Sequence, residues 1–146
     1  MGFLLGDASR LLRRRFDQDA RAIGVTRPQW RLLFALSRAE GINQGGLAEQ
    51  LEVEAITLCR MVDRLQEADL VERRADPADR RAWRLFLTDK ARPLLDTMHE
   101  IGHRVIEEAL DGLDAARRDA LAETLGIIRA NLSTRPTDEP LKEAAR

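Results

Sequence analysis

The sequence is poor in cysteine and aromatic residues and has no long apolar run. Its single cysteine, Cys59, has no second thiol to pair with, which excludes an internal disulfide and favours a reducing compartment. No apolar run approaches the roughly 18 residues that a membrane-spanning helix needs. The opening MGFLLGDASRLLRRR places its basic cluster after a very short apolar run, which is not the order of a signal peptide. These absences predict a cytoplasmic protein.

The chain also lacks a net charge large enough to indicate its partner. Lys and Arg total 24 against 25 Asp and Glu, for a formal net charge of −1. Positive charge is nevertheless concentrated in two segments. Residues 1–31 hold seven Arg against three Asp, and residues 57–92 hold nine Arg and Lys against seven acids. Only such local patches can attract an anionic partner.

Residues typical of a catalytic or metal site are scarce. No nucleophile–base pair and no phosphate-cradling loop is recognisable. His99 and His103 lie four residues apart on a predicted helix, a spacing compatible with a metal pair, but no acid or thiol completes the ligand set. Asp76 and Asp79 stand beside arginines that would neutralise them. We therefore predict no enzyme, no metal and no cofactor, with the histidines at the surface or in a pocket.

Helical periodicity is clear at both ends of the chain. Apolar positions at three- and four-residue steps predict a helix over 3–23 with an arginine-rich opposite face. The same pattern predicts a helix over 89–110, capped by Thr88, and a last helix to about residue 132. Nothing else in the chain is large enough to cover their apolar stripes, so we predict a two-fold homodimer. The proline-containing segment 134–146 is predicted to be a flexible tail.

Short helices and a hairpin are predicted between these long helices. A capping box of Thr26 and Gln29 begins a helix over 28–38. Asn43 caps a short helix over 44–51, whose two glycines weaken it.

The next helix is longer and its outer face is basic. It covers 55–68, with Arg60 and Arg64 opposite its apolar face. A short helix, a turn and a basic-faced helix are typical of a unit that enters a DNA major groove. The runs LVERRA and WRLFLT alternate in twos around a charged loop, which predicts a β-hairpin.

These elements define the predicted fold class, which is mainly α with a small β-hairpin wing. The winged helix-turn-helix covers 28–88, and dimerisation helices flank it over 1–27 and 89–133. A two-fold dimer of such domains predicts a palindromic DNA site with half-sites about 10–10.5 base pairs apart.

The middle of the chain resembles the MarR family of winged-helix regulators, and within it the SlyA-like branch. The resemblance is carried by Arg60 and the Asp63-Arg64-Leu65 run, the wing segments DLVER and DPADRR, and Leu87-Thr88. It implies a DNA-binding dimer and, usually, transcriptional repression relieved by a small molecule. Departures from the family pattern at Gly45-Gly46, Ile56, Cys59 and Ala82 concern the target sequence rather than the DNA-binding role.

Two sets of site residues follow. The predicted DNA contacts are Thr57, Arg60, Arg64, Asp79, Arg80 and Arg81. The resemblance implies that Arg81 enters the minor groove and that Asp79 holds it. The predicted ligand contacts are Arg10, Arg13, Trp30 and Phe34. The resemblance implies that the first three align with family positions that contact an aromatic carboxylate. The set is chemically suited to that ligand, because guanidinium pairs with carboxylate and indole stacks on an aryl ring.

The predicted effector is therefore an aromatic acid or its CoA thioester. Other interpretations of these residues are also compatible with the sequence. The arginines near the N-terminus could be solvated, with Trp30 in the core. The protein could be a constitutive or activating regulator, or an adaptor that uses its winged helix to bind protein. Cys59 could be a redox sensor or a spectator.

Overall fold

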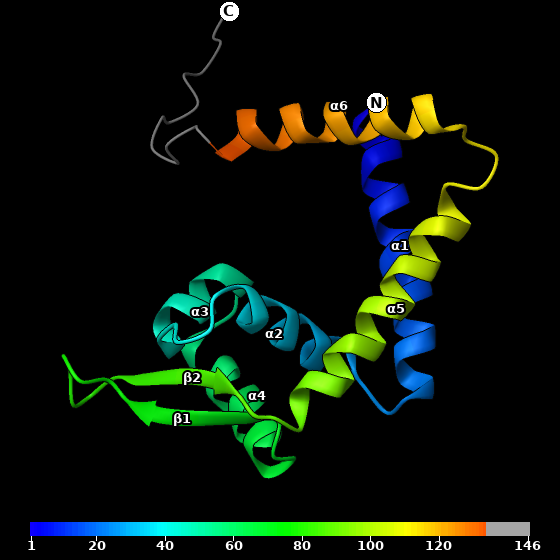
Figure 1. Ribbon diagram of the computed structural model, residues 1–146. Coiled ribbons are helices and arrows are strands. Elements are labelled where there is room, and N and C mark those ends of the chain that lie inside the picture. The colour runs from blue at the N-terminus through cyan, green and yellow to red at the C-terminus, as the bar shows by residue number, and fades with distance from the viewer. Residues whose placement is uncertain (134–146) are drawn as a thin grey trace, which may run out of the picture. The chain divides into compact units, whose positions relative to one another are not determined.

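The computed structural model describes residues 1–133, which form six helices and one hairpin (Figure 1). In chain order these are α1 (Gly2–Ala22), α2 (Arg27–Arg38), α3 (Gln44–Leu51), α4 (Ala55–Glu67), β1 (Val71–Ala75), β2 (Trp83–Leu87), α5 (Ala91–Ala109) and α6 (Ala115–Ser133). The mainly helical fold with a small hairpin is thereby confirmed. One compact unit covers Met1–Ala109, and α6 belongs to a second unit that starts at Leu110. The segment 134–146, predicted to be a tail, lies outside the described residues.

Two helices begin where side-chain caps predict them. The backbone N–H of Thr26 donates to Gln29 Oε1 at 2.9 Å, at the start of α2. Asn43 Oδ1 accepts the N–H of Gly46 at 2.7 Å, at the start of α3. A Cβ on Gly46 would lie 3.3 Å from that same Asn43 oxygen and 3.3 Å from Ile42. The second glycine of the pair therefore leaves room for the cap that starts its own helix.

The start of α5 differs from the prediction. The helix begins at Ala91 rather than Asp89, and residues 89 and 90 form a turn. The Thr88 hydroxyl donates to the carbonyl oxygen of Asp69 at 2.6 Å, and Lys90 Nζ donates to that of Ala68 at 3.0 Å. These bonds to the residues that follow α4 hold positions 88–90 in a turn, so α5 begins after them. Thr88 Oγ1 still accepts the N–H of Ala91, at 3.3 Å.

The core of the first unit is aliphatic and lies between α2, α3, α4 and the hairpin. Its largest fully buried side chains are Leu32, Leu33, Leu36, Leu47, Leu58, Leu65, Leu85, Met98, Val62 and Val71. Helix α5 packs along α1 and also contacts α2, so the aliphatic core continues toward the N-terminal helix (Figure 1). The hairpin projects away from α1 and α5 (Figure 1).

The hairpin is antiparallel, and its register places alternate residues toward the helices. Val71 pairs with Leu87 and Arg73 with Leu85, and three of these four residues are buried. Backbone bonds connect β2 to the loop before α3, because Leu85 donates to Ile42 at 3.0 Å and accepts from Gly41 at 2.8 Å. The hairpin is thus anchored at its base.

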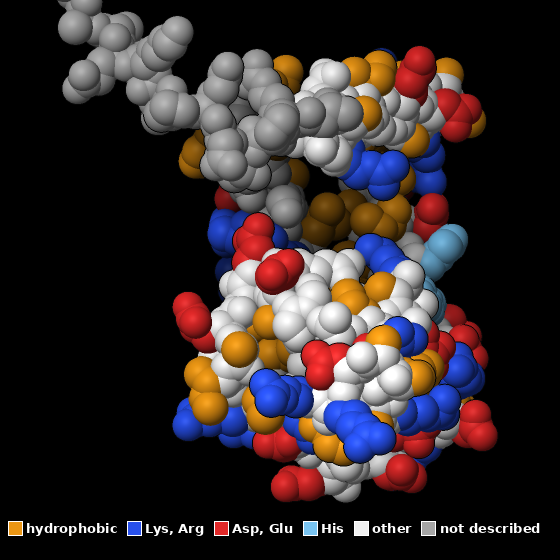
Figure 2. Space-filling model, turned by 90° about the vertical axis from the view of Figure 1, so that its left-hand side faces the viewer, with side chains coloured by type: hydrophobic (Ala, Val, Ile, Leu, Met, Phe, Trp, Pro, Cys, Tyr) orange, Lys and Arg blue, Asp and Glu red, His pale blue; other side chains and the backbone are white. Residues whose placement is uncertain are grey.

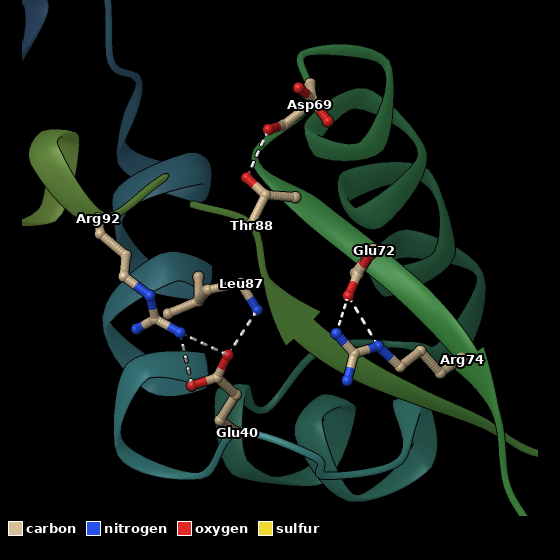
Figure 3. A network of polar contacts seen from close by, with 7 residues as sticks. All are labelled: Glu40, Asp69, Glu72, Arg74, Leu87, Thr88 and Arg92. Atoms are coloured by element: carbon tan, nitrogen blue, oxygen red, sulfur yellow. Dashed lines mark hydrogen bonds and ion pairs between the residues drawn. The ribbon is translucent and has the colours of Figure 1, made fainter. Parts of the chain in front are cut away.

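A polar network connects the base of the hairpin to α2 and α5 (Figure 3). Glu40 Oε1 accepts the backbone N–H of Leu87 at 3.0 Å and pairs with Arg92 Nη2 at 3.3 Å. The Thr88–Asp69 bond lies beside it (Figure 3). The elements that precede and follow the hairpin are therefore held together at one point.

None of the helices in residues 1–133 is both long enough and apolar enough to cross a bilayer.

Candidate nucleic-acid interface and effector cavity

Helix α4 separates an apolar inner face from an exposed outer face. Leu58, Val62 and Leu65 are buried in the core. On the outside, Thr57, Arg60 and Arg64 are all exposed. Their side chains have no hydrogen-bond or ion-pair partner within residues 1–133. The hydrogen-bond donors of these three side chains are therefore available to another molecule.

Arg73 of β1 connects the hairpin to both helices of the helix-turn-helix. Its guanidinium donates to Gln44 Oε1 at 2.6 Å, to Gln66 Oε1 at 2.8 Å and to the carbonyl oxygen of Cys59 at 3.3 Å. It also pairs with Asp63 Oδ1 at 2.7 Å, and its side chain is only 16% exposed. Arg73 therefore positions α4 against the wing.

Arg73 was not among the predicted site residues. Asp63, one of the residues that carry the family resemblance, has Arg73 as its partner. Alternation along β1 places position 73 on the inward face, and that is the signal that could have indicated a structural arginine.

Acidic side chains hold the turn at the tip of the hairpin. Asp76 accepts the N–H of Ala78 at 2.9 Å and Nε of Arg84 at 3.0 Å. The amide of Ala78, and after it Arg84, lowers the pKa of Asp76 below its usual value. Asp79 Oδ1 accepts the backbone N–H of Arg81 at 3.0 Å. The tip is thus ordered by bonds within the loop itself.

The two arginines of this tip are exposed. Arg80 and Arg81 have no side-chain partner within the part of the chain that the structure describes. Figure 2, which faces the side from which the hairpin projects, shows Lys and Arg side chains gathered over the lower part of the molecule, interspersed with acids. The acids of the tip bond to Arg84 and to backbone amides, not to these two guanidinium groups.

A cavity of about 350 Å³ lies within the first unit, between α1, α2 and α5. Its lining comprises Leu12, Arg13, Phe16, Trp30, Phe34, Arg38, Met98, His99, Gly102, His103, Val105 and Ile106. The wall is mainly apolar. Arg13 and Arg38 are exposed at its edge and, like the arginines of the tip, have no partner among residues 1–133. An apolar cavity with unpaired cations at its edge is suited to an amphipathic anion.

An aromatic cluster forms one wall of the cavity. The ring centroids of Phe16 and Trp30 are 4.9 Å apart in an edge-to-face arrangement, and those of Trp30 and Phe34 are 6.0 Å apart. The ring of His99 lies 5.0 Å from that of Phe34. Such tilted arrangements are the favoured geometry of aromatic pairs.

Asp17 fixes the orientation of Trp30. This carboxylate is 5% exposed and accepts the indole N–H of Trp30 at 2.8 Å and Nε of Arg27 at 2.7 Å. Burial alone would raise the pKa of Asp17, but the hydrogen bonds from Arg27 and Trp30 outweigh it and the pKa is lowered. Because its N–H is already used, Trp30 can offer a ligand only its ring.

The predicted ligand residues divide into two groups. Arg13, Trp30 and Phe34 all line the cavity. Arg10 does not line it and pairs with Asp7, with Nε 3.1 Å from Oδ1.

Arg38 and His103 line the cavity but were not among the predicted ligand contacts. Arg38 follows Phe34 by one helical turn, and this spacing could have placed both on the same face. No group of three His, Cys, Asp or Glu within residues 1–133 could hold a metal ion. His99 and His103 lie at the cavity instead.

Comparisons with known proteins agree with this geometry. A sequence profile described as the MarR family matches residues 23–82. The solved structure of transcriptional regulator PA3341 is 34% identical, with a TM-score of 0.77 over 92% of this chain and 98% of that chain. Wild-type MarR from E. coli in its apo form is 25% identical, with a TM-score of 0.81 over 88% of this chain and 95% of that one.

The transcriptional repressor CouR, solved bound to a 23-mer DNA duplex, is 28% identical, with a TM-score of 0.74 over 88% of this chain and 92% of that one. The fold and the exposed basic helix define a winged-helix, DNA-binding regulator of transcription. The chain belongs to the MarR family. Its family and fold are those of transcriptional regulators, which are not enzymes.

Proposed function

We propose that this protein is a homodimeric repressor that binds a palindromic operator in the cytoplasm and is released by an aromatic carboxylate or its CoA thioester. The observation that carries the proposal is the cavity, an aromatic and aliphatic space with Arg13 and Arg38 at its edge and without a partner in the described residues 1–133. It lies where α1 and α5 meet α2 of the DNA-binding domain.

The proposed DNA contacts are the exposed side chains of α4 and the wing. Thr57, Arg60 and Arg64 enter the major groove, where arginine binds guanine edges or phosphates. Arg81 enters the minor groove and Arg80 lies beside it, because narrow A·T-rich grooves attract arginine. Asp79 holds Arg81 through its backbone N–H. The similar repressor CouR was solved bound to a 23-mer DNA duplex, which supports DNA binding by this chain.

The proposed dimer uses residues 1–27 and 89–133, with residues 28–88 as the DNA-binding domain. Helix α1 exposes Phe3, Leu4 and Leu5, at 82%, 68% and 40%. Helix α6 exposes a further apolar set, Leu121, Leu125, Ile127 and Leu132. Exposed apolar side chains at this density are typical of a surface that a second copy covers.

The proposed effector has an aryl ring and a negative charge. The ring packs against Trp30 and Phe34, and the charge pairs with Arg13 and Arg38, since guanidinium and carboxylate form strong charge-assisted hydrogen bonds. In a CoA thioester the phosphates supply the charge. Arg10 contributes if the ligand draws it away from Asp7.

Release follows from differential affinity. Trp30 and Phe34 belong to α2, whereas Leu12 and Arg13 belong to α1. A ligand between these helices favours a spacing of the two DNA-binding domains that does not match the operator. Coupling of this kind is typically about 1–3 kcal/mol, or roughly 5- to 150-fold in affinity.

A DNA-binding titration tests both parts. The full-length protein is titrated with its own promoter fragment and with random DNA at two salt concentrations, with and without a panel of aryl acids and aryl-CoA thioesters. We expect specific binding that weakens steeply with salt, and at least one panel compound that weakens it further. The absence of a sequence-specific complex would exclude the repressor and favour a protein-binding adaptor. Specific DNA binding that no compound of the panel weakens would refute the proposed effector but not the proposed DNA binding.

Arginine variants then locate the effector. Arg13→Ala and Arg38→Ala should weaken the effector response about tenfold, the loss of a charge-assisted hydrogen bond. Arg14→Ala is the matched control, because Arg14 is an exposed arginine of the same helix that does not line the cavity. An equal response in all three variants would place the ligand elsewhere. Arg10→Ala tests whether Arg10 takes part.

A further inference from the structure

Ile56 is an exposed aliphatic side chain at the start of the DNA-reading helix. It is the second residue of α4, and 64% of its surface is exposed. At about 3.6 residues per turn, Ile56 shares a stripe with Arg60 and Asp63. That stripe lies opposite the buried side chains of the helix. Ile56 therefore points away from the core, in the direction of the proposed DNA contacts.

Neither helix formation nor packing explains an isoleucine at this position. The N-cap of α4 is Glu54, so Ile56 has no capping role. It belongs neither to the core cluster of the first unit nor to the partly buried side chains that pack against it. A β-branched residue is also slightly unfavourable within a helix. Its apolar surface is therefore free to contact a partner.

We infer that Ile56 reads thymine, by packing against the C5-methyl group in the major groove. This inference rests on the proposed binding of DNA through α4. The first residues of a recognition helix contact base edges. The thymine methyl is the one apolar group that the standard bases present in the major groove, and apolar side chains contact it. Ile56 is thus a specificity-determining residue that adds to the polar contacts of Thr57 and Arg60.

The contact has a physical signature that separates it from the arginine contacts. It carries no charge, so it contributes nothing to the salt dependence of binding. It also depends on a single methyl group of the DNA. Deoxyuridine lacks that methyl and is otherwise identical to thymidine, so replacing one with the other removes the contact and no hydrogen bond.

The test uses an operator selected from random duplexes by the full-length wild-type protein. Each thymine is replaced in turn by deoxyuridine, symmetrically in both half-sites, and affinity is measured for the wild type and for Ile56→Ala. We expect one thymine position at which the replacement weakens wild-type binding about fourfold for each methyl removed. The same replacement should leave the affinity of Ile56→Ala unchanged.

Thr57→Ser is the matched control, because it removes the methyl of the neighbouring exposed side chain and keeps its hydroxyl. This variant should retain the deoxyuridine pattern of the wild type. Ile56→Ala should melt at the wild-type temperature, since the side chain lies outside the core.

The contrary outcomes are distinct. Loss of the pattern in Thr57→Ser with its retention in Ile56→Ala would assign the methyl contact to Thr57 and overturn the inference. An operator with no methyl-sensitive position would overturn it as well, with the proposed function intact. A protein that selects no sequence would overturn both.

Discussion

Asp17 is the only charged side chain that is buried within residues 1–133, and it connects α1 to α2. It pairs with Arg27 and accepts the indole N–H of Trp30. Asp17→Asn keeps the shape and an acceptor for the indole but removes the charge. We expect it to lower the free energy of unfolding by about 1.5–3 kcal/mol, the range for hydrogen bonds to charged groups. Urea unfolding of both proteins at neutral pH measures the difference.

The same pair predicts a pH dependence. The folded-state pKa of Asp17 is lowered from 3.8, so its contribution is present above the unfolded-state pKa and is lost as pH falls through the folded-state pKa. The stability gap between wild type and Asp17→Asn should therefore be smaller at pH 3 than at pH 7. Melting temperatures at the two pH values measure it. A gap of the same size at both would show that charge is not the cause.

Arg81 and Arg14 are both exposed arginines without a partner among residues 1–133, but only Arg81 is at the tip of the wing. Arg81→Ala should weaken operator binding by more than about 1 kcal/mol at fixed salt, because a minor-groove guanidinium is lost. The slope of log K against log salt should also fall by about one. Arg14→Ala should bind as the wild type does. Unchanged affinity in Arg81→Ala would refute the assigned role.

At the scale of the elements, the guanidinium of Arg73 adds a polar connection between the wing and α4 to the apolar core that they share. Lysine keeps the charge but cannot reach four acceptors at once. We expect Arg73→Lys to lose about 1.5–3 kcal/mol of stability, the range for hydrogen bonds to charged groups, and also to weaken operator binding. Arg74→Lys is the control, since Arg74 is exposed and its contacts, the Glu72 carboxylate and the Phe86 ring, both lie within the hairpin. Equal losses in both variants would mean that Arg73 has no special positioning role.

Local chemistry explains how much of the fold was predictable. Helix α3 covers the predicted 44–51 because its start depends on Asn43, three residues from the amide that it caps. Helix α5 begins two residues later than predicted because its start depends on Asp69 and Ala68, about 20 positions away. Contacts within one helical turn can be predicted from the sequence, whereas hydrogen bonds between residues far apart in the chain cannot.

The cavity follows the same rule. Arg13 and Trp30 were predicted from family positions and Phe34 from its place one helical turn beyond Trp30, and the three line the cavity together. The pairing of Arg10 with Asp7 lies within one helical turn and was open to prediction. His103 was predicted at the surface or in a pocket, and the choice between the two depends on how α5 packs against α1. The carboxylate behind Trp30 was missed, since nothing in the spacing of Asp17 indicates that it is buried.

At the scale of the whole molecule, the proposed dimer makes α6 the element to perturb. Leu121, Leu125 and Leu132 are spaced by four and then seven residues, which places them on one face of this helix. Leu125→Glu should dissociate the dimer, because a carboxylate cannot be buried without a partner. Sedimentation equilibrium measures the mass, and operator binding should fall with it. Glu123→Lys, a charge change on the opposite face of α6, should remain dimeric. A Leu125→Glu protein of dimer mass would exclude α6 from the interface.

The exposed face of α4 has a consequence for how such proteins diverge. Thr57, Arg60 and Arg64 have no partner within residues 1–133, whereas the attachment of α4 to the wing depends on Arg73 behind it. Substitutions at these three positions therefore cost little stability. After gene duplication, a descendant could acquire a new operator through a few changes there while its fold and the proposed effector response persist. Target preference and folding depend on different residues of one helix, so each can evolve without the other.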